Sequence, residues 1–145
     1  ELAKRGCNVV CNDLGGQDSL HALVKDINSQ GGSALAETSN VLDASTIVEN
    51  SIKKYGSVDI LINNAGILRD KSFHKLTDEE WNAVIDVHLH GTYRLCHAVW
   101  PKMQQNMYGR IVNVTSGAGK RYISKRATLQ SPFFHILKDI YLCHK

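Results

Sequence analysis

The chain has 145 residues, and its 43% hydrophobic content predicts one globular domain with a core of its own. It contains no apolar run of membrane-spanning length, and residues 1–5 do not have the pattern of a secretory signal, so we expect an intracellular protein. The four cysteines show no Cys-x-x-Cys spacing, which argues against a disulfide framework and favours reduced thiols. The net charge of +3 is unevenly spread, because residues 1–119 carry −2 and residues 120–145 carry +5.

Short apolar runs alternate with amphipathic segments along the chain. In chain order, the expected elements are a last helical turn at residues 2–5, a strand at 7–12, a helix at 18–30, a strand at 33–37, a helix at 43–55, a strand at 58–63, a helix at 77–104 and a strand at 109–116. Strands that alternate with helices of this length imply right-handed crossovers and a parallel sheet. The sequence therefore predicts a doubly wound α/β fold of the Rossmann type.

Glycines and polar residues mark the expected helix ends. Gly6 and Gly56 each follow a last helical turn, where a C-cap glycine is typical. Asp43 can cap the helix at 43–55, and Thr77-Asp78-Glu79-Glu80 has the pattern of a capping box. Gly91 interrupts the long helix, so we expect it to pack closely against another backbone.

The run Asn63-Asn64-Ala65-Gly66 directly follows a buried strand. In open α/β sheets, ligands bind in the crevice at the carboxyl ends of the strands. The amides of Asn63 and Asn64 can tie this strand end to its neighbours, while Ala65 and Gly66 leave room for a flat ring or a ribose. The alternative is an ordinary strand-to-loop turn.

Two further polar residues stand at strand ends. Asp13 can accept hydrogen bonds from both hydroxyls of an adenosine ribose and repel a 2′-phosphate, which favours NAD over NADP. The alternative is a turn aspartate that bonds its own backbone. Ser116, followed by Gly117-Ala118-Gly119, would face the same cleft and can donate a hydrogen bond to a substrate carbonyl. The alternative is an ordinary serine in a strand-end turn.

Together these features closely resemble the short-chain dehydrogenase/reductase family. The resemblance covers residues 1–119, and within the family residues 12–16 and 63–73 look like a peroxisomal branch that acts on (3R)-3-hydroxyacyl-CoA in fatty-acid β-oxidation. It implies NAD-dependent oxidation of a secondary alcohol, with a 3-hydroxyacyl-CoA or a steroid as substrate, in the peroxisome; otherwise a cytoplasmic location is expected. It also implies a homodimer in the intact family member, and we expect neither nucleic acid nor a membrane as a partner.

The resemblance also assigns residue roles. Ser116 matches the catalytic serine of the family. The family's tyrosine and lysine would fall at Leu129 and Phe133, and neither of these can transfer a proton. His88 stands where many members carry a helix asparagine of the proton relay; the alternative is a histidine packed against the sheet with one ring nitrogen satisfied. The histidines of this helix lack the spacing of a metal site, so no metal is expected.

The chain also departs from the family pattern. The glycine-rich TGxxxGxG loop that holds the cofactor pyrophosphate would precede residue 1, so we expect that loop and the first strand to be missing. We further expect the last two strands to be missing and the sheet to split into two two-stranded halves. From Lys120 onward the resemblance stops, so residues 120–145 are expected to be a basic tail outside the fold. In this tail, Tyr141 and Lys145 match the spacing of the family's tyrosine and lysine by chance.

We therefore expect an enzyme by family whose chain, as given, is inactive. One alternative is a non-catalytic interaction protein that uses the helix from Thr77 as an association surface. Another is a gene fragment with wrongly assigned exon boundaries, whose tail results from a shifted reading frame, a retained intron or an alternative exon. The basic run at residues 120–126 could bind nucleic acid or anionic lipid, but an exposed segment without a partner is the simpler interpretation.

Overall fold

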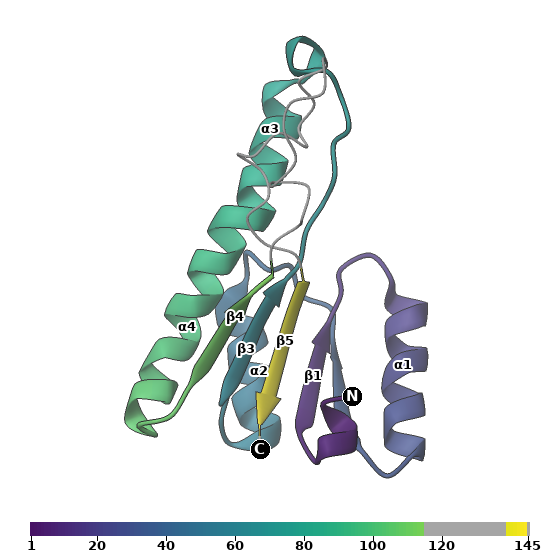
Figure 1. Ribbon diagram of the computed structural model, residues 1–145, viewed down its shortest axis with the longest axis vertical. Helices are drawn as coiled ribbons and strands as arrows, with labels where there is room; N and C mark the ends of the chain where they lie inside the picture. The colour runs from purple at the N-terminus through teal and green to yellow at the C-terminus, as the bar shows by residue number, and fades with distance from the viewer. Residues whose placement is uncertain (115–138, 145) are drawn as a thin grey trace.

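The computed structural model describes residues 1–114 and, as a strand, residues 139–144 (Figure 1). The strands are β1 (Asn8–Asn12), β2 (Ser33–Glu37), β3 (Ile60–Asn64), β4 (Arg110–Asn113) and β5 (Asp139–His144). The longer helices are α1 (Gln17–Ser29), α2 (Ala44–Tyr55), α3 (Asp78–Ile85) and α4 (Thr92–Gln105). A π-helical stretch, η3 (Asp86–Gly91), joins α3 to α4, and two 3-10 turns complete the described part, η1 (Ala3–Arg5) and η2 (Phe73–Lys75).

The five strands form one sheet in the order β2-β1-β5-β3-β4. β1 pairs with β2, and β3 with β4, in parallel, whereas β5 is antiparallel to both of its neighbours. The pairs formed by the four predicted strands are therefore parallel as expected, and the sheet is mixed because β5, which was not predicted as a strand, runs antiparallel at its centre. The expected split into two halves is wrong, because β5 pairs with the inner edges of β1 and β3.

The position of β5 differs from the expected tail outside the fold. Its first residue, Asp139, pairs with Asn64 at the carboxyl end of β3, and its last, His144, pairs with Asn8 at the start of β1. Because β3 and β4 are parallel, their carboxyl ends lie at the same end of the sheet. A later strand that enters the sheet from that end runs antiparallel to both. Unpaired amides and carbonyls on two facing edges favour such an insertion.

Helices cover both faces of the sheet, which confirms the predicted doubly wound arrangement. On one face, Leu20 of α1 packs against Val9 and Cys11 of β1. On the other face, α2 and α4 contribute Ile47 and Leu95 to the main core. Figure 1 shows α1 beside β1 and α2 behind the middle of the sheet. Among the described residues, no helix has the length and apolar character that crossing a membrane requires.

The predicted helix ends are mostly confirmed. Gly6 and Gly56 both adopt φ +81°, the left-handed conformation of a C-cap glycine. Both hydrogen bonds of the capping box at Thr77 are present. Asp43 occupies the N-cap position of α2, but its side chain makes no capping hydrogen bond, so that part of the prediction is wrong.

Gly91 packs closely as expected, but against a side chain rather than a backbone. A Cβ atom placed on Gly91 would lie 2.6 Å from Cγ2 of Val41. Val41 belongs both to the main core and to the cleft described below. The glycine therefore lets the end of η3 approach the segment between β2 and α2.

Candidate functional site

A cleft of about 670 Å³ opens at the carboxyl ends of β1 and β3. It is lined by residues 11–15, Ser19, Leu20, Leu23, Asn40, Val41, residues 65–67 and Val87. Its volume lies within the range of sites for small molecules and cofactors, which is about 300–1,000 Å³. The structure thus brings together Asp13, Ala65 and Gly66, which the sequence predicted to share one crevice. Ser116 lies outside the described residues.

Asp13 is exposed at the end of β1, where its own turn holds its carboxylate. Oδ1 accepts hydrogen bonds from the amides of Gly15, at 2.9 Å, and of Gly16, at 3.2 Å. The alternative considered above, a turn aspartate that bonds its own backbone, therefore applies to Oδ1. A Cβ atom on Gly16 would lie 2.7 Å from Oδ2, so the missing side chain at that position keeps space around the second oxygen. Asp13 thus presents an oriented negative charge to the cleft.

Asn63 does not line the cleft, but its side chain joins the end of β3 to neighbouring elements. Its side chain is 1% exposed, and Nδ2 donates to Oδ1 of Asn113, at 2.9 Å, and to Sγ of Cys96, at 3.3 Å. For Asn63, though not for Asn64, these bonds confirm the predicted tie between the end of β3 and its neighbours, here β4 and α4. Oδ1 of Asn63 is buried without a hydrogen-bond partner in the described part of the chain. Asn64 also does not line the cleft.

His88 is buried in η3 and contacts the segment that follows Gly66. Its Nε2 lies 2.9 Å from the carbonyl oxygen of Ile67 and 3.1 Å from the amide nitrogen of the same residue. The ring nitrogen can donate to the first or accept from the second, depending on the tautomer. These contacts match the alternative of a packed histidine, and they position Ile67, which lines the cleft. A proton-relay role for His88 stays a prediction.

Sequence reasoning missed the cleft wall that follows β2. Asn40 and Val41 line the same cleft as Asp13, and Asn12 also contributes to it. Nδ2 of Asn12 donates to the carbonyls of Glu37, at 3.1 Å, and of Ser39, at 2.9 Å. The available signal was a charged residue, Glu37, at the end of an otherwise apolar strand, followed by polar residues that resemble a simple turn.

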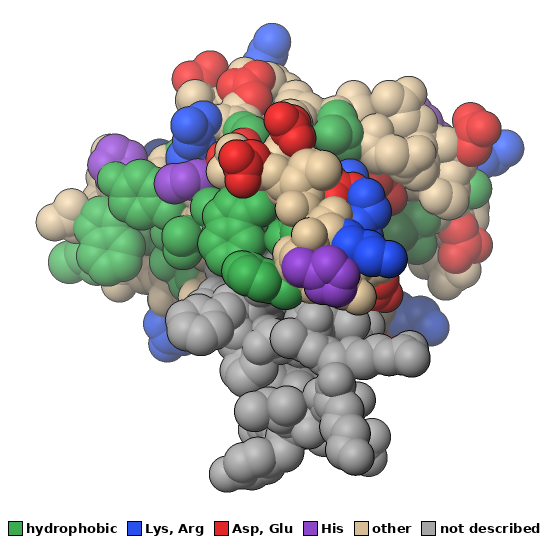
Figure 2. All heavy atoms as spheres, turned by 90° about the horizontal axis from the view of Figure 1, so that it is seen from above, with side chains coloured by type: hydrophobic (Ala, Val, Ile, Leu, Met, Phe, Trp, Pro, Cys, Tyr) green, Lys and Arg blue, Asp and Glu red, His purple; other side chains and the backbone are tan. Residues whose placement is uncertain are grey.

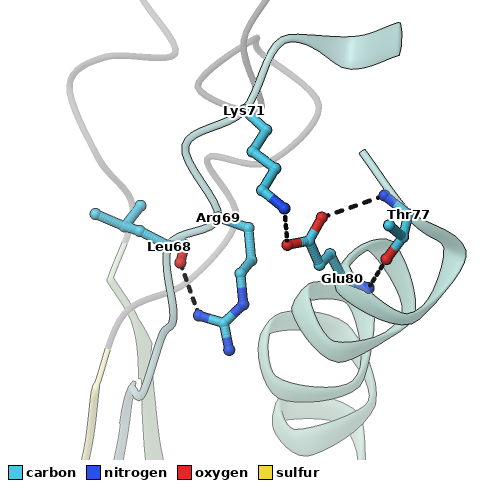
Figure 3. Close-up of polar contacts among 5 residues, drawn as sticks. All are labelled: Leu68, Arg69, Lys71, Thr77 and Glu80. Atoms are coloured by element: carbon cyan, nitrogen blue, oxygen red, sulfur yellow. Dashed lines mark hydrogen bonds and ion pairs between the residues drawn. The ribbon is translucent and has the colours of Figure 1, made fainter. Parts of the chain in front are cut away.

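The loop that follows the cleft segment is attached to α3 through Glu80 (Figure 3). Oε1 of Glu80 lies 2.5 Å from Nζ of Lys71, and Oε2 accepts from the amide of Thr77 at 3.2 Å. The hydrogen bond with Lys71, and then that with Thr77, lower the pKa of Glu80. Nη1 of Arg69 donates to the carbonyl of its neighbour Leu68 at 2.9 Å. In the described part of the chain, no group of three or more histidine, cysteine or acidic side chains could hold a metal ion.

Comparisons with a family model and with known proteins all point to short-chain dehydrogenases and to peroxisomal multifunctional enzymes. A family model described as short chain dehydrogenase matches residues 1–128. The chain is 43% identical to peroxisomal multifunctional enzyme type 2 of Drosophila melanogaster, covering 81% of this chain and 21% of that protein. It is 45% identical to peroxisomal multifunctional enzyme A of Dictyostelium discoideum, covering 82% of this chain and 29% of that protein. The chain thus spans less than a third of the length of these two relatives.

The fold is also similar to that of solved short-chain dehydrogenases. A short chain dehydrogenase from Mycobacterium avium superposes with a TM-score of 0.73 at 35% identity, covering 81% of this chain and 47% of the other. A short-chain dehydrogenase/reductase from Burkholderia xenovorans superposes with a TM-score of 0.79 at 28% identity, covering 92% of this chain and 53% of the other.

Proposed function

Because the chain belongs to the short chain dehydrogenase family, we propose that its cleft binds the adenosine half of NAD and serves the oxidation of a secondary alcohol. Family membership confirms the resemblance predicted from residues 1–119. The observation that carries the proposal is the shared cleft: Asp13 from the end of β1 lies in one cavity with Ala65 and Gly66 from the end of β3. Nicotinamide cofactors bind at this place in doubly wound sheets.

The preference for NAD over NADP rests on Asp13. The amides of Gly15 and Gly16 fix the orientation of its carboxylate, which can then accept hydrogen bonds from the two ribose hydroxyls. The same negative charge repels a 2′-phosphate. The space that Gly16 leaves beside Oδ2 suits such a ribose contact.

The substrate class follows from the relatives. Since the chain is similar to peroxisomal multifunctional enzymes, we take (3R)-3-hydroxyacyl-CoA as the first substrate to test, a steroid as the second, and the peroxisome as the location. Oxidation would transfer a hydride from the alcohol carbon to the bound nicotinamide, while the hydroxyl group loses its proton. Ser116 is our candidate for the group that hydrogen-bonds the carbonyl oxygen.

We assign the oxidation to the intact family member, whereas the 145-residue chain would bind the adenosine half of the cofactor without turning over the alcohol. Leu129 and Phe133 stand where the family has its tyrosine and lysine, and hydrocarbon side chains cannot transfer a proton. We therefore expect no NADH from (3R)-3-hydroxyacyl-CoA and NAD with the 145-residue chain. Turnover by the purified chain would contradict this part of the proposal.

Cofactor binding is tested by titrating the chain with NAD and with NADP in a calorimeter. The Asp13→Ala variant should bind NAD about tenfold more weakly, because it loses charge-assisted hydrogen bonds, and should not lose affinity for NADP. Asp18→Ala is the matched control, since Asp18 is also an exposed carboxylate but does not line the cleft. Equal effects of the two substitutions, or no NAD binding by the unmodified chain, would refute the proposal.

A second candidate function is association through the long helix, because that helix has an unusually apolar surface. Trp81, Leu89, Tyr93 and Trp100 all lie on α3, η3 and α4, and Tyr93 and Trp100 are 64% and 59% exposed. Figure 2 shows hydrophobic side chains gathered with histidines on the face seen from above. Co-purification with a full-length relative, without NADH formation, would support this function, whereas Trp100→Glu should abolish it.

A further inference from the structure

Glu37 is a buried carboxylate that is hydrogen-bonded both to the end of β1 and to the turn before Asn40, two segments that supply residues to the cleft. It ends β2 and is 7% exposed, although it does not itself line the cleft. We propose that Glu37 is a positioning residue that holds the Asp13 side of the cleft in place against the side formed by Asn40 and Val41. This inference rests in part on the proposed function, because it concerns the site assigned to NAD.

The side chain of Glu37 organises the segment that leads into Asn40. Oε1 accepts from the amides of Thr38, at 2.9 Å, and Ser39, at 3.0 Å, and from the hydroxyl of Ser39, at 2.7 Å. Oε2 accepts from Nδ2 of Asn50 in α2 at 2.8 Å. One carboxylate thus ties the turn after β2 to the helix behind it, which leaves the next residue, Asn40, in a fixed place at the cleft.

The main chain of Glu37 holds the part of the cleft lining that comes from the end of β1. Its carbonyl accepts from the amide of Asp13 at 3.1 Å and from Nδ2 of Asn12 at 3.1 Å. Nδ2 of Asn12 also donates to the carbonyl of Ser39 at 2.9 Å. The position of the Asp13 backbone therefore depends on the same residue that fixes the turn before Asn40.

The charge of Glu37 matters for this arrangement. A carboxylate only accepts hydrogen bonds, and four donors converge on its two oxygens. Burial raises the pKa of Glu37, but the hydrogen bonds from Asn50, Ser39 and Thr38 outweigh it, so the pKa is lowered overall. A glutamine of the same shape would turn an NH₂ group toward one of these donors.

Three variants and one control variant test the inference. Glu37→Gln keeps the shape but loses the charge that strengthens all four hydrogen bonds, and it turns an NH₂ group toward Asn50, which can accept from it only by rotating its own amide. The double variant Glu37→Gln/Asn50→Asp places a carboxylate acceptor at that position. Glu49→Gln is the matched control, because Glu49 is an exposed carboxylate on α2. Asn50→Ala removes one of the four donors from an exposed position, and decides the question if Glu37→Gln does not fold.

Two measurements separate positioning from a merely structural role. The first is amide hydrogen exchange at Asp13 and Ser39, with Gly56 as an internal reference because its amide bonds within α2. Exchange at both residues should become about tenfold faster in Glu37→Gln and less so in Asn50→Ala, and return in the double variant. The second is the ratio of the dissociation constants for NADP and NAD, which should fall toward 1 in Glu37→Gln and recover in the double variant.

The exchange and binding measurements have the following decisive outcomes. Unchanged exchange at Asp13, or the same change in Glu49→Gln, overturns the inference. Faster exchange with an unaltered NADP-to-NAD ratio also overturns it, because Glu37 would then act only on its own turn. If exchange stays fast in the double variant, the role assigned to the hydrogen bond between Glu37 and Asn50 is overturned. If the unmodified chain binds neither nucleotide, the proposed function fails, and the exchange at Asp13 alone decides the positioning role.

Discussion

The central strand β5 offers the most direct test of the fold. Deleting residues 139–145 removes four residue pairs with β1 and four with β3. A backbone hydrogen bond contributes ~0.5–1.5 kcal/mol net of its exchange with water, so the loss of about one bond per residue pair should lower the free energy of unfolding by about 4–12 kcal/mol. A whole domain is stable by about 5–15 kcal/mol, so the shortened chain should be largely unfolded.

The assay is urea denaturation of the full and shortened chains, followed by circular dichroism. Removal of Lys145 alone, the residue after β5, is the control and should leave the midpoint unchanged. Leu142→Pro keeps the chain length but removes one amide from a strand with neighbours on both sides, so it should lower the midpoint strongly. Equal midpoints for the full and shortened chains would refute the reasoning, because β1 and β3 would then not depend on β5.

Three further predictions concern single positions. The pKa of Glu37 is lowered in the folded state, so its ionised carboxylate stabilises the fold above the unfolded-state pKa of about 4.3, and this contribution is lost as the pH falls through the folded-state pKa. Between pH 7 and pH 3 the urea midpoint should therefore fall less in Glu37→Gln than in the unmodified chain. Gly91→Ala should cost ~1–3 kcal/mol despite the better helix propensity of alanine, because the new Cβ meets the stiff side chain of Val41; an unchanged thermal midpoint would contradict this. Thr77→Ala should cost ~1 kcal/mol through loss of the cap on α3, measured by the same thermal unfolding, and no change would mean that the capping bond contributes little.

Much of the fold could be predicted because its signals are local. β2 was predicted with the bounds that the structure shows, and the end of α2 followed from Gly56, whose left-handed conformation is the one a C-cap requires. The partner of the inner edges of β1 and β3 could not be predicted in the same way. Pairing between residues so far apart leaves no local pattern, and β5 lies beyond residues 1–128, the part of the chain that the family model matches.

The parts of the candidate site that could be predicted are those in which a polar or small residue directly follows a strand. Asp13, Ala65 and Gly66 were placed in one cleft from their positions after two strands, and the structure confirms that they share it. The wall of Asn40 and Val41 was missed, because its shape depends on hydrogen bonds to Glu37 that join three separate elements. Short polar segments of this kind carry no periodic signal.

The antiparallel central strand also affects the order in which the chain can fold during synthesis. Asn8 pairs with His144 and Cys11 with Tyr141, so these contacts close loops of roughly 130 residues and raise the contact order of the domain. A ribosome releases β1 long before its neighbour exists. The nascent chain would therefore carry two open strand edges until residues 139–144 emerge, and open edges of this kind favour pairing with other chains during that interval.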